Sequence, residues 1–289
     1  MSQHDDSVSS GTARELPSEL DLGVPQSARI YDYWLGGKDN FAADRAVAEA
    51  LAGQIPTIRV MVRSQRVFLA RAVEYLVRVG GIRQFLDIGT GIPSENNVHE
   101  VAQHLAPECR VLYVDNDPVV LAHARARMTS TPEGKTAFIP ADLREPEKIL
   151  SDATLRATLN LDQPVALLLI GVLHHLREAD DPYRIVATLL DALPSGSYFA
   201  LTQPTADFDP EAMAGMAATA EQSGIPYVPR SRDETEVFFT GLELVEPGLV
   251  PIPAWNPLPR EEETTATLST ASTPDPYAVY GWAGVARKP

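Results

Sequence analysis

Residues 83–94 read RQFLDIGTGIPS, a short apolar run that ends in a glycine-rich turn. Residues 83–88 are predicted to form a strand, because a brief apolar run bounded by a turn is typical of a buried one. A helix is expected after the turn, through residues 99–105. Gly89 and Gly91 carry no side chains, so a ligand can lie against the backbone there, next to the free N–H groups of the helix start. The segment therefore predicts a strand–turn–helix unit with a ligand site at the turn.

The alternation of strand, turn and helix continues toward the C-terminus. Asp-Pro pairs precede three of the expected helices, since Asp caps a helix start and Pro suits its first turn. Such alternation predicts an α/β fold with a doubly wound, Rossmann-like and mostly parallel sheet covered by helices on both faces. Four further strands are expected at residues 110–115, 136–140, 165–170 and 197–202.

Two late strands are expected at residues 242–247 and 277–287, without a helix between them. They predict an antiparallel pair at one edge of the sheet, which a plain dinucleotide-binding sheet lacks. Residues 251–276 are rich in Pro, Thr and Glu and are not expected to contribute to the core.

The N-terminal part of the chain differs from the rest in composition. Residues 1–25 are polar and predict a flexible tail. Residues 26–80 predict a helical cap or lid: a short helix, a turn at Gly36 and Gly37, a second helix, and a long third helix. Residues 81–289 form the expected main domain.

Composition narrows the classes of partner. The net charge of −15 argues against nucleic acid, whose phosphates need a dense basic surface, and against an anionic membrane. A small-molecule partner is therefore expected. Cys109 is the single cysteine and the first residues lack the apolar core of a signal peptide, so a cytoplasmic location is expected.

Acidic residues stand at the ends of the first three expected strands. Asp87 ends the first, before the turn that holds Gly89, Thr90, Gly91 and Pro93. Asp115 ends the second, where a carboxylate can accept both hydroxyl groups of a ribose, and Asn116 can line an adenine edge. Asp142 ends the third and can accept from an adenine amino group, with the Leu143 N–H available to a ring nitrogen. Because ligands of doubly wound sheets bind beyond the carboxyl ends of the strands, these ends together predict a nucleoside site. The residues of this site are Asp87, Gly89, Thr90, Gly91, Pro93, Asp115, Asn116, Asp142 and Leu143.

The same strand ends resemble those of a known class of enzymes. FLDIGTG at residues 85–91, YVDNDP at 113–118 and ADLREP at 141–146 are similar to the first three motifs of class I S-adenosylmethionine-dependent methyltransferases. More narrowly, SARIYDYWLGGKDNF at 27–41 and LLLIGVLHHL at 167–176 resemble a family called S-adenosyl methyltransferase, common in actinomycetes. In that family, as here, Pro93 replaces the usual third glycine of the turn. The resemblance implies S-adenosylmethionine as cofactor and leaves the methyl acceptor open.

Methyl transfer needs alignment and exclusion of water more than acid–base groups, and it needs no metal. The fourth expected strand is followed by Gly171, beside the expected methyl position, and then by His174 and His175. Either histidine could be an acceptor-side base, or both could be hydrogen-bonded residues at a strand end.

Two N-terminal groups are further candidates. Arg63 shares a helix face with two other arginines and could hold the methionine carboxylate, or this face could simply be solvated. Tyr31, Tyr33 and Trp34 could form a lid over the cationic sulfonium or pack against the sheet edge.

Two other functions remain open at this point. An NAD(P)-dependent oxidoreductase would carry G-x-G-x-x-G, whereas this chain has Ser94 in the last position. A catalytically silent S-adenosylmethionine-binding module is also compatible, because fold alone does not establish activity.

Overall fold

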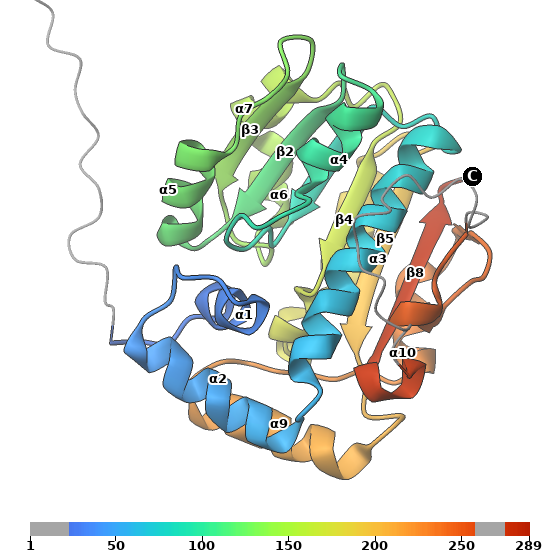
Figure 1. Cartoon of the computed structure of the whole chain (residues 1–289). Helices are drawn as coiled ribbons and strands as arrows, with labels where there is room; N and C mark the ends of the chain where they lie inside the picture. Colours follow the sequence, from blue (N-terminus) through green and yellow to red (C-terminus); the bar gives the residue numbers. More distant parts are fainter. Residues whose placement is uncertain (1–22, 258–274) are drawn as a thin grey trace, which may run out of the picture.

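A computed structural model of the chain describes residues 23–257 and 275–289. Helices lie on both faces of one central sheet (Figure 1). Most of the polar tail predicted at residues 1–25 lies outside the described residues. No helix in the described ranges is long and apolar enough to cross a membrane. The α-helices are α1 (Ser27–Leu35), α2 (Ala42–Gln54), α3 (Ile58–Arg78), α4 (Val98–Leu105), α5 (Pro118–Arg127), α6 (Pro146–Ser151), α7 (Ala153–Thr158), α8 (Pro182–Asp191), α9 (Pro210–Gln222) and α10 (Arg232–Glu236).

The sheet has the strand order β3-β2-β1-β4-β5-β8-β6, and β7 also pairs with β8. The first five strands are parallel, and β8 runs antiparallel between β5 on one side and β6 and β7 on the other. The predicted α/β class and the late antiparallel strands are confirmed. The strands are β1 (Gln84–Ile88), β2 (Arg110–Asp115), β3 (Lys135–Pro140), β4 (Ala166–Ile170), β5 (Tyr198–Pro204), β6 (Glu243–Leu244), β7 (Val250–Pro251) and β8 (Gly281–Arg287).

Alternate side chains of the inner strands enter two separate cores. In β2, Val111 and Tyr113 face the core under α3 and α4, while Leu112 and Val114 face the core under α6 and α8. This follows from the two-residue repeat of a strand, and both faces are apolar because helices cover both.

The late strands differ in part from the prediction. The strand expected at residues 242–247 is shorter, because Pro247 has no N–H to donate and Gly248, with φ of 87°, turns the chain toward β7. The segment that begins at residue 251 also enters the core: Trp255 is fully buried, and its ring meets Phe68 edge-on at a centroid distance of 5.1 Å. The expectation that this segment stays out of the core is therefore wrong at its start, while residues 258–274 lie outside the described residues.

Three helices cover the carboxyl end of the parallel strands. Figure 1 shows α1, α2 and α9 below the tips of β4 and β5. A buried ion pair ties α1 to α2, with Nε of Arg29 3.0 Å from Asp44, and the indole N–H of Trp34 donates to the carbonyl of Ala48. The two helices are thus fixed over the edge of the sheet where ligands of such folds bind.

Candidate active site

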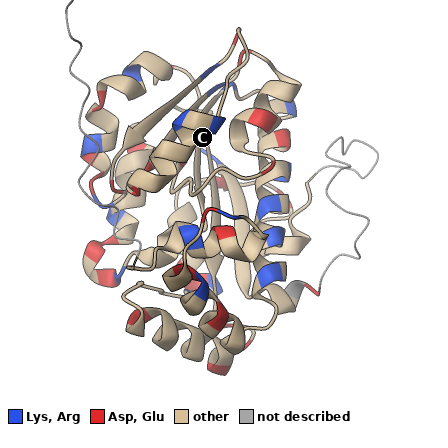
Figure 2. Cartoon of the chain, turned by 60° about the vertical axis from the view of Figure 1, so that its left-hand side comes forward, with Lys and Arg blue, Asp and Glu red and all other residues tan. Residues whose placement is uncertain are grey.

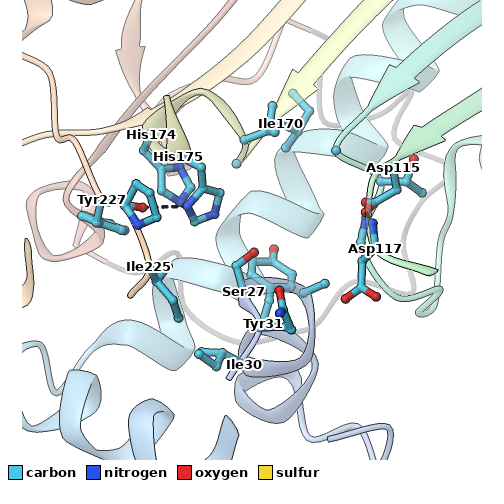
Figure 3. Close-up of a pocket in the computed structure, with 18 of the residues that line it drawn as sticks. Ser27, Ile30, Tyr31, Asp115, Asp117, Ile170, His174, His175, Ile225 and Tyr227 are labelled. Atoms are coloured by element: carbon cyan, nitrogen blue, oxygen red, sulfur yellow. Dashed lines mark hydrogen bonds between the residues drawn. The ribbon is translucent and has the colours of Figure 1, made fainter. Parts of the chain in front are cut away.

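A cavity of about 400 Å³ lies between the carboxyl ends of the parallel strands and the helices α1 and α9. This volume falls within the range of small-molecule sites. In Figure 3, Asp115 and Asp117 lie at one side of the cavity and His174, His175 and Tyr227 at the other. Most of the predicted site residues line it, namely Tyr31, Trp34, Asp87, Gly89, Thr90, Gly91, Asp115, Asn116, Asp142, Leu143, Gly171, His174 and His175.

Gly89 and Gly91, the two glycines of the turn after β1, have different structural roles. Both have positive φ, 77° for Gly89 and 67° for Gly91, which favours glycine. A Cβ atom at Gly89 would lie 2.4 Å from a methyl carbon of Val172, so this glycine permits close packing of the turn on the segment after β4. A Cβ at Gly91 would meet nothing within 4 Å, so this glycine is the one that leaves space beside the backbone.

The Asp87 carboxyl is buried in the cavity wall, with 7% of the residue exposed, and no hydrogen-bond partner for it occurs among the described residues. Burial raises the pKa of Asp87 to about 7; Arg66 opposes this shift and Asp115 adds to it. A buried acid without a partner is suited to receive a cationic or N–H group of a ligand.

Asp115 braces the glycine turn from the neighbouring strand. One of its carboxylate oxygens accepts from the N–H of Gly91 and the other from the N–H of Asp117, both at 2.9 Å. Burial raises the pKa of Asp115, and these two hydrogen bonds reduce the increase. Each oxygen keeps a lone pair for another donor.

Asp142 lies in the same cavity as Asp115, so the strand ends converge as predicted. The side-chain amide of Asn116, the residue after Asp115, donates to Asp142 at 3.1 Å. Burial raises the pKa of Asp142, but hydrogen bonds from Arg144 and Asn116 outweigh it and lower the pKa overall.

The two histidines stand on a single 3₁₀ turn, η1 (Leu173–His175), directly after β4. Nδ1 of His175 lies 2.8 Å from the carbonyl oxygen of Pro226, while Nδ1 of the buried His174 has no partner among the described residues. Burial lowers the pKa of both, that of His174 well below its usual value, so both rings are neutral near pH 7.

Three predicted residues do not line the cavity: Arg63, Tyr33 and Pro93. Arg63 is exposed, because α3 turns residues 62, 65, 66 and 69 toward the cavity and leaves position 63 on the outer face. Tyr33 also faces outward, where its hydroxyl donates to Glu49.

Arg66 occupies the place predicted for Arg63. It lines the cavity, donates to the carbonyl oxygens of Glu95 and Asn96, and has a buried Nε without a partner among the described residues. The spacing of the three arginines along α3 was compatible with this position of Arg66, but it did not show which of the three reaches the cavity.

The α1 helix forms one wall of the cavity. The hydroxyl of Tyr31 donates to the carbonyl of Val62, and burial raises the pKa of Tyr31 to about 12. Trp34 is buried between α1 and α2. Tyr31 and Trp34 thus contact α3 and α2. Packing of this segment against the sheet edge and motion of the helix as a lid both stay predictions, as does the division at residues 26–80 and 81–289.

The segment that follows α9 was not predicted to belong to the site. Ile225, Pro226 and Tyr227 line the cavity. Ile225 and Tyr227 lie opposite Asp115 (Figure 3). Their signal in the sequence is weak, because a short apolar run after a helix is equally typical of simple packing.

Comparison with known proteins identifies the chain. The family model described as S-adenosyl methyltransferase matches residues 13–289. The chain belongs to this family. S-adenosylmethionine is therefore its cofactor, and methyl transfer is its reaction.

Solved structures agree with the family assignment. A DUF574 family protein from Streptomyces avermitilis is 44% identical, with a TM-score of 0.87 over 93% of this chain and 99% of that one. A candidate methyltransferase from Thermobifida fusca is 38% identical, with a TM-score of 0.81 over 93% of this chain and 96% of that one. None of the curated proteins compared with the chain is a significant match.

More distant structures share the fold alone. The plantazolicin methyltransferase BpumL, solved in complex with S-adenosylhomocysteine, is 14% identical, with a TM-score of 0.53 over 91% of this chain and 95% of that one. Membership of the S-adenosyl methyltransferase family decides against the NAD(P)-dependent oxidoreductase considered from the sequence.

Proposed function

We propose that the cavity binds S-adenosylmethionine across the ends of β1, β2 and β3 and methylates a small molecule held beside His174 and His175. The convergence of Asp87, Asp115 and Asp142 on one cavity carries this proposal. When bound, S-adenosylmethionine supplies a methyl group on a positively charged sulfur.

Each part of the cofactor has a matching group in the cavity. Asp115 keeps free lone pairs for the ribose hydroxyls, and Asn116, Asp142 and the Leu143 N–H lie at the expected adenine edge. Gly91 leaves open space for the methionine tail beside the turn.

The charged ends of the methionine tail fit two further residues. The buried carboxyl of Asp87 suits the α-ammonium group, and the unpartnered Nε of Arg66 suits the α-carboxylate. Arg66 replaces Arg63 in this role, because only Arg66 reaches the cavity. Gly171, at the tip of β4, is placed beside the sulfur.

A small-molecule acceptor is part of the proposal. The net charge is −15, and Lys and Arg are interspersed with Asp and Glu in the view of Figure 2, so neither feature favours nucleic acid or an anionic membrane. A cytoplasmic location is also proposed, since the single cysteine, Cys109, allows no intrachain disulfide.

Calorimetry with S-adenosylhomocysteine, S-adenosylmethionine and NADH tests the binding mode. We expect both adenosyl compounds to bind and NADH not to bind. Asp142→Asn should weaken S-adenosylhomocysteine by about tenfold, since a hydrogen bond to a charged group contributes about 1.5–3 kcal/mol. Asp191→Asn, an exposed carboxylate at the end of α8, is the matched control and should bind as the wild type does. Equal binding by Asp142→Asn and wild type would exclude the proposed adenine contact.

A second measurement addresses the silent-module alternative. Incubation with S-adenosylmethionine and an acceptor library should release S-adenosylhomocysteine. Tight cofactor binding without release, over acceptors of every charge class, would favour a binding module.

A further inference from the structure

The half of the cavity opposite Asp115 takes no part in the proposed contacts with the cofactor. We define it as the acceptor chamber, and Figure 3 shows four of its residues, His174, His175, Ile225 and Tyr227, grouped opposite Asp115. Its walls come from α1, α9, η1 and the segment after α9. The residues used to define it are Ile30, His174, His175, Met216, Ile225 and Tyr227.

The acceptor chamber carries no charged side chain among these six residues, since both histidines are neutral near pH 7. Two arginines come near. Asp142, Asp180 and the carbonyl oxygen of His175 already hold the guanidinium of Arg144, and Glu178 and the carbonyl oxygens of Leu173 and Leu176 hold that of Arg230. A carboxylate, phosphate or ammonium group would be buried there without a counter-ion, which is costly. The chamber therefore favours an uncharged molecule.

Two polar atoms in the chamber wall lack partners among the described residues. They are Nδ1 of His174 and the hydroxyl oxygen of Tyr227. His174 is only 8% exposed, and the centroids of the His174 and Tyr227 rings are 4.8 Å apart. Buried polar groups in folded proteins are nearly always hydrogen-bonded. Two neighbouring side chains with unpaired polar atoms therefore indicate that the ligand carries a polar group at this place. Of the other residues that define the chamber, Ile30, Met216 and Ile225 are apolar and only His175 is polar, so the ligand needs a polar group on a mostly apolar body.

His175 is oriented to accept a proton. A carbonyl oxygen only accepts hydrogen bonds, so Nδ1 must carry the hydrogen that faces Pro226. In the neutral ring, Nε2 then holds the lone pair. A phenol is a stronger acid than an aliphatic alcohol, so a neutral imidazole takes a proton from it more readily, and burial lowers the pKa of His175 and makes it a weaker base still.

We infer that the acceptor is an uncharged aromatic molecule with one phenolic hydroxyl, which Tyr227 and His174 bind and His175 deprotonates; this rests on the proposed function. The hydroxyl proton moves to Nε2 of His175, the phenolic oxygen forms a bond to the methyl carbon, and the electron pair of the broken S–CH₃ bond stays on sulfur. The proton then leaves His175 for water. The products are an aryl methyl ether and S-adenosylhomocysteine.

Binding of matched probes tests the acceptor class without turnover. The full chain is first titrated with S-adenosylhomocysteine, and failure at this step would overturn the proposed function itself. The saturated protein is then titrated with 2-naphthol, naphthalene-2-carboxylate, 2-naphthylmethylammonium and naphthalene, and with the corresponding one-ring series. We expect the phenols to bind at least about tenfold more tightly than either charged counterpart, because an unpaired buried charge costs several kcal/mol. If S-adenosylhomocysteine binds but no phenol exceeds its charged counterparts, the acceptor class is wrong.

Two variants test the residues. Tyr227→Phe should weaken 2-naphthol by about two- to tenfold and leave naphthalene unchanged, since only one hydrogen bond is lost. His175→Gln should keep 2-naphthol binding within about threefold but slow its methylation by about a hundredfold or more. His104→Gln, an exposed histidine in the last turn of α4, is the control. Thermal melting of each variant checks folding, and unchanged methylation in a folded His175→Gln would exclude His175 as the base.

Discussion

Binding of S-adenosylhomocysteine should depend on pH through Asp87. The free protein holds this carboxyl at a pKa of about 7. It is therefore ionised to roughly 9% at pH 6 and roughly 91% at pH 8 by the ordinary titration relation. The α-ammonium of the ligand needs the ionised form, so affinity should rise by about tenfold between these two values, equivalent to about 1.4 kcal/mol. A cation beside Asp87 lowers its pKa in the complex, so binding releases a proton.

Calorimetry in two buffers with different ionisation enthalpies measures both the affinity and the proton released. Asp87→Asn should bind more weakly at pH 8 and lose most of the rise between pH 6 and 8. Asp191→Asn should keep the wild-type profile. A wild-type affinity that is equal at pH 6 and pH 8, or an Asp87→Asn protein with the wild-type slope, would refute the role of this carboxyl.

The same residue predicts the opposite trend for the stability of the ligand-free protein. The pKa of Asp87 is raised from the model-peptide range near 4 to about 7. Its contribution to stability is therefore fully present below pH 4 and is lost as pH rises through 7, by an amount on the order of 4 kcal/mol. Without ligand, Asp87→Asn should thus become more stable than the wild type as pH increases from 5 to 8, in urea denaturation. A constant difference over this range would contradict the assignment.

Three substitutions test the structure around the site. Gly89→Ala should destabilise the protein by about 1–3 kcal/mol in urea denaturation, from positive φ and the contact with Val172, and Val172→Ala should relieve part of this. Trp255→Ala should cost about 3–5 kcal/mol in the same assay, because the ring is fully buried. Asp44→Ala should leave the charge of Arg29 unpaired. Because this ion pair holds α1 over the cavity, both the affinity for S-adenosylhomocysteine and the protection of α1 from hydrogen exchange should decrease. Unchanged hydrogen exchange in α1 would contradict this role of the pair.

The sheet was predictable because its signals are local. The first four parallel strands are mostly apolar runs that end in a glycine or an acidic residue or have one within the next two positions. Asp117, Asp181 and Asp209 cap their helices as expected. The short strand β7 and the buried Trp255 were not predicted, since a segment rich in proline has no periodic pattern. Its contacts with Phe68 and Tyr75, 180 or more positions earlier in the chain, make it part of the core.

The convergence of the strand ends on one cavity, where we propose that the cofactor binds, was predictable for the same reason. The carboxyl ends of neighbouring parallel strands meet at one edge, so a residue's place in its strand fixes its place in space. Asp115 and Asp142 were placed in this way. The choice between Arg63 and Arg66 was not fixed, because it depends on the rotation of α3 against the sheet, which the spacing of three arginines leaves open.

The acceptor half follows no such rule. Ile30, Met216 and Tyr227 come from α1, α9 and the segment after α9, which meet only when the helices close over the strand tips. These residues also hold no cofactor contact in the proposed arrangement, so they can vary without loss of the methyl donor. Binding sites commonly combine a rigid scaffold with variable added segments. Exchange of residues 223–228 between two family members should therefore change which acceptor is bound while S-adenosylhomocysteine affinity stays constant. A parallel loss of both affinities would mean that the two halves of the cavity are one site.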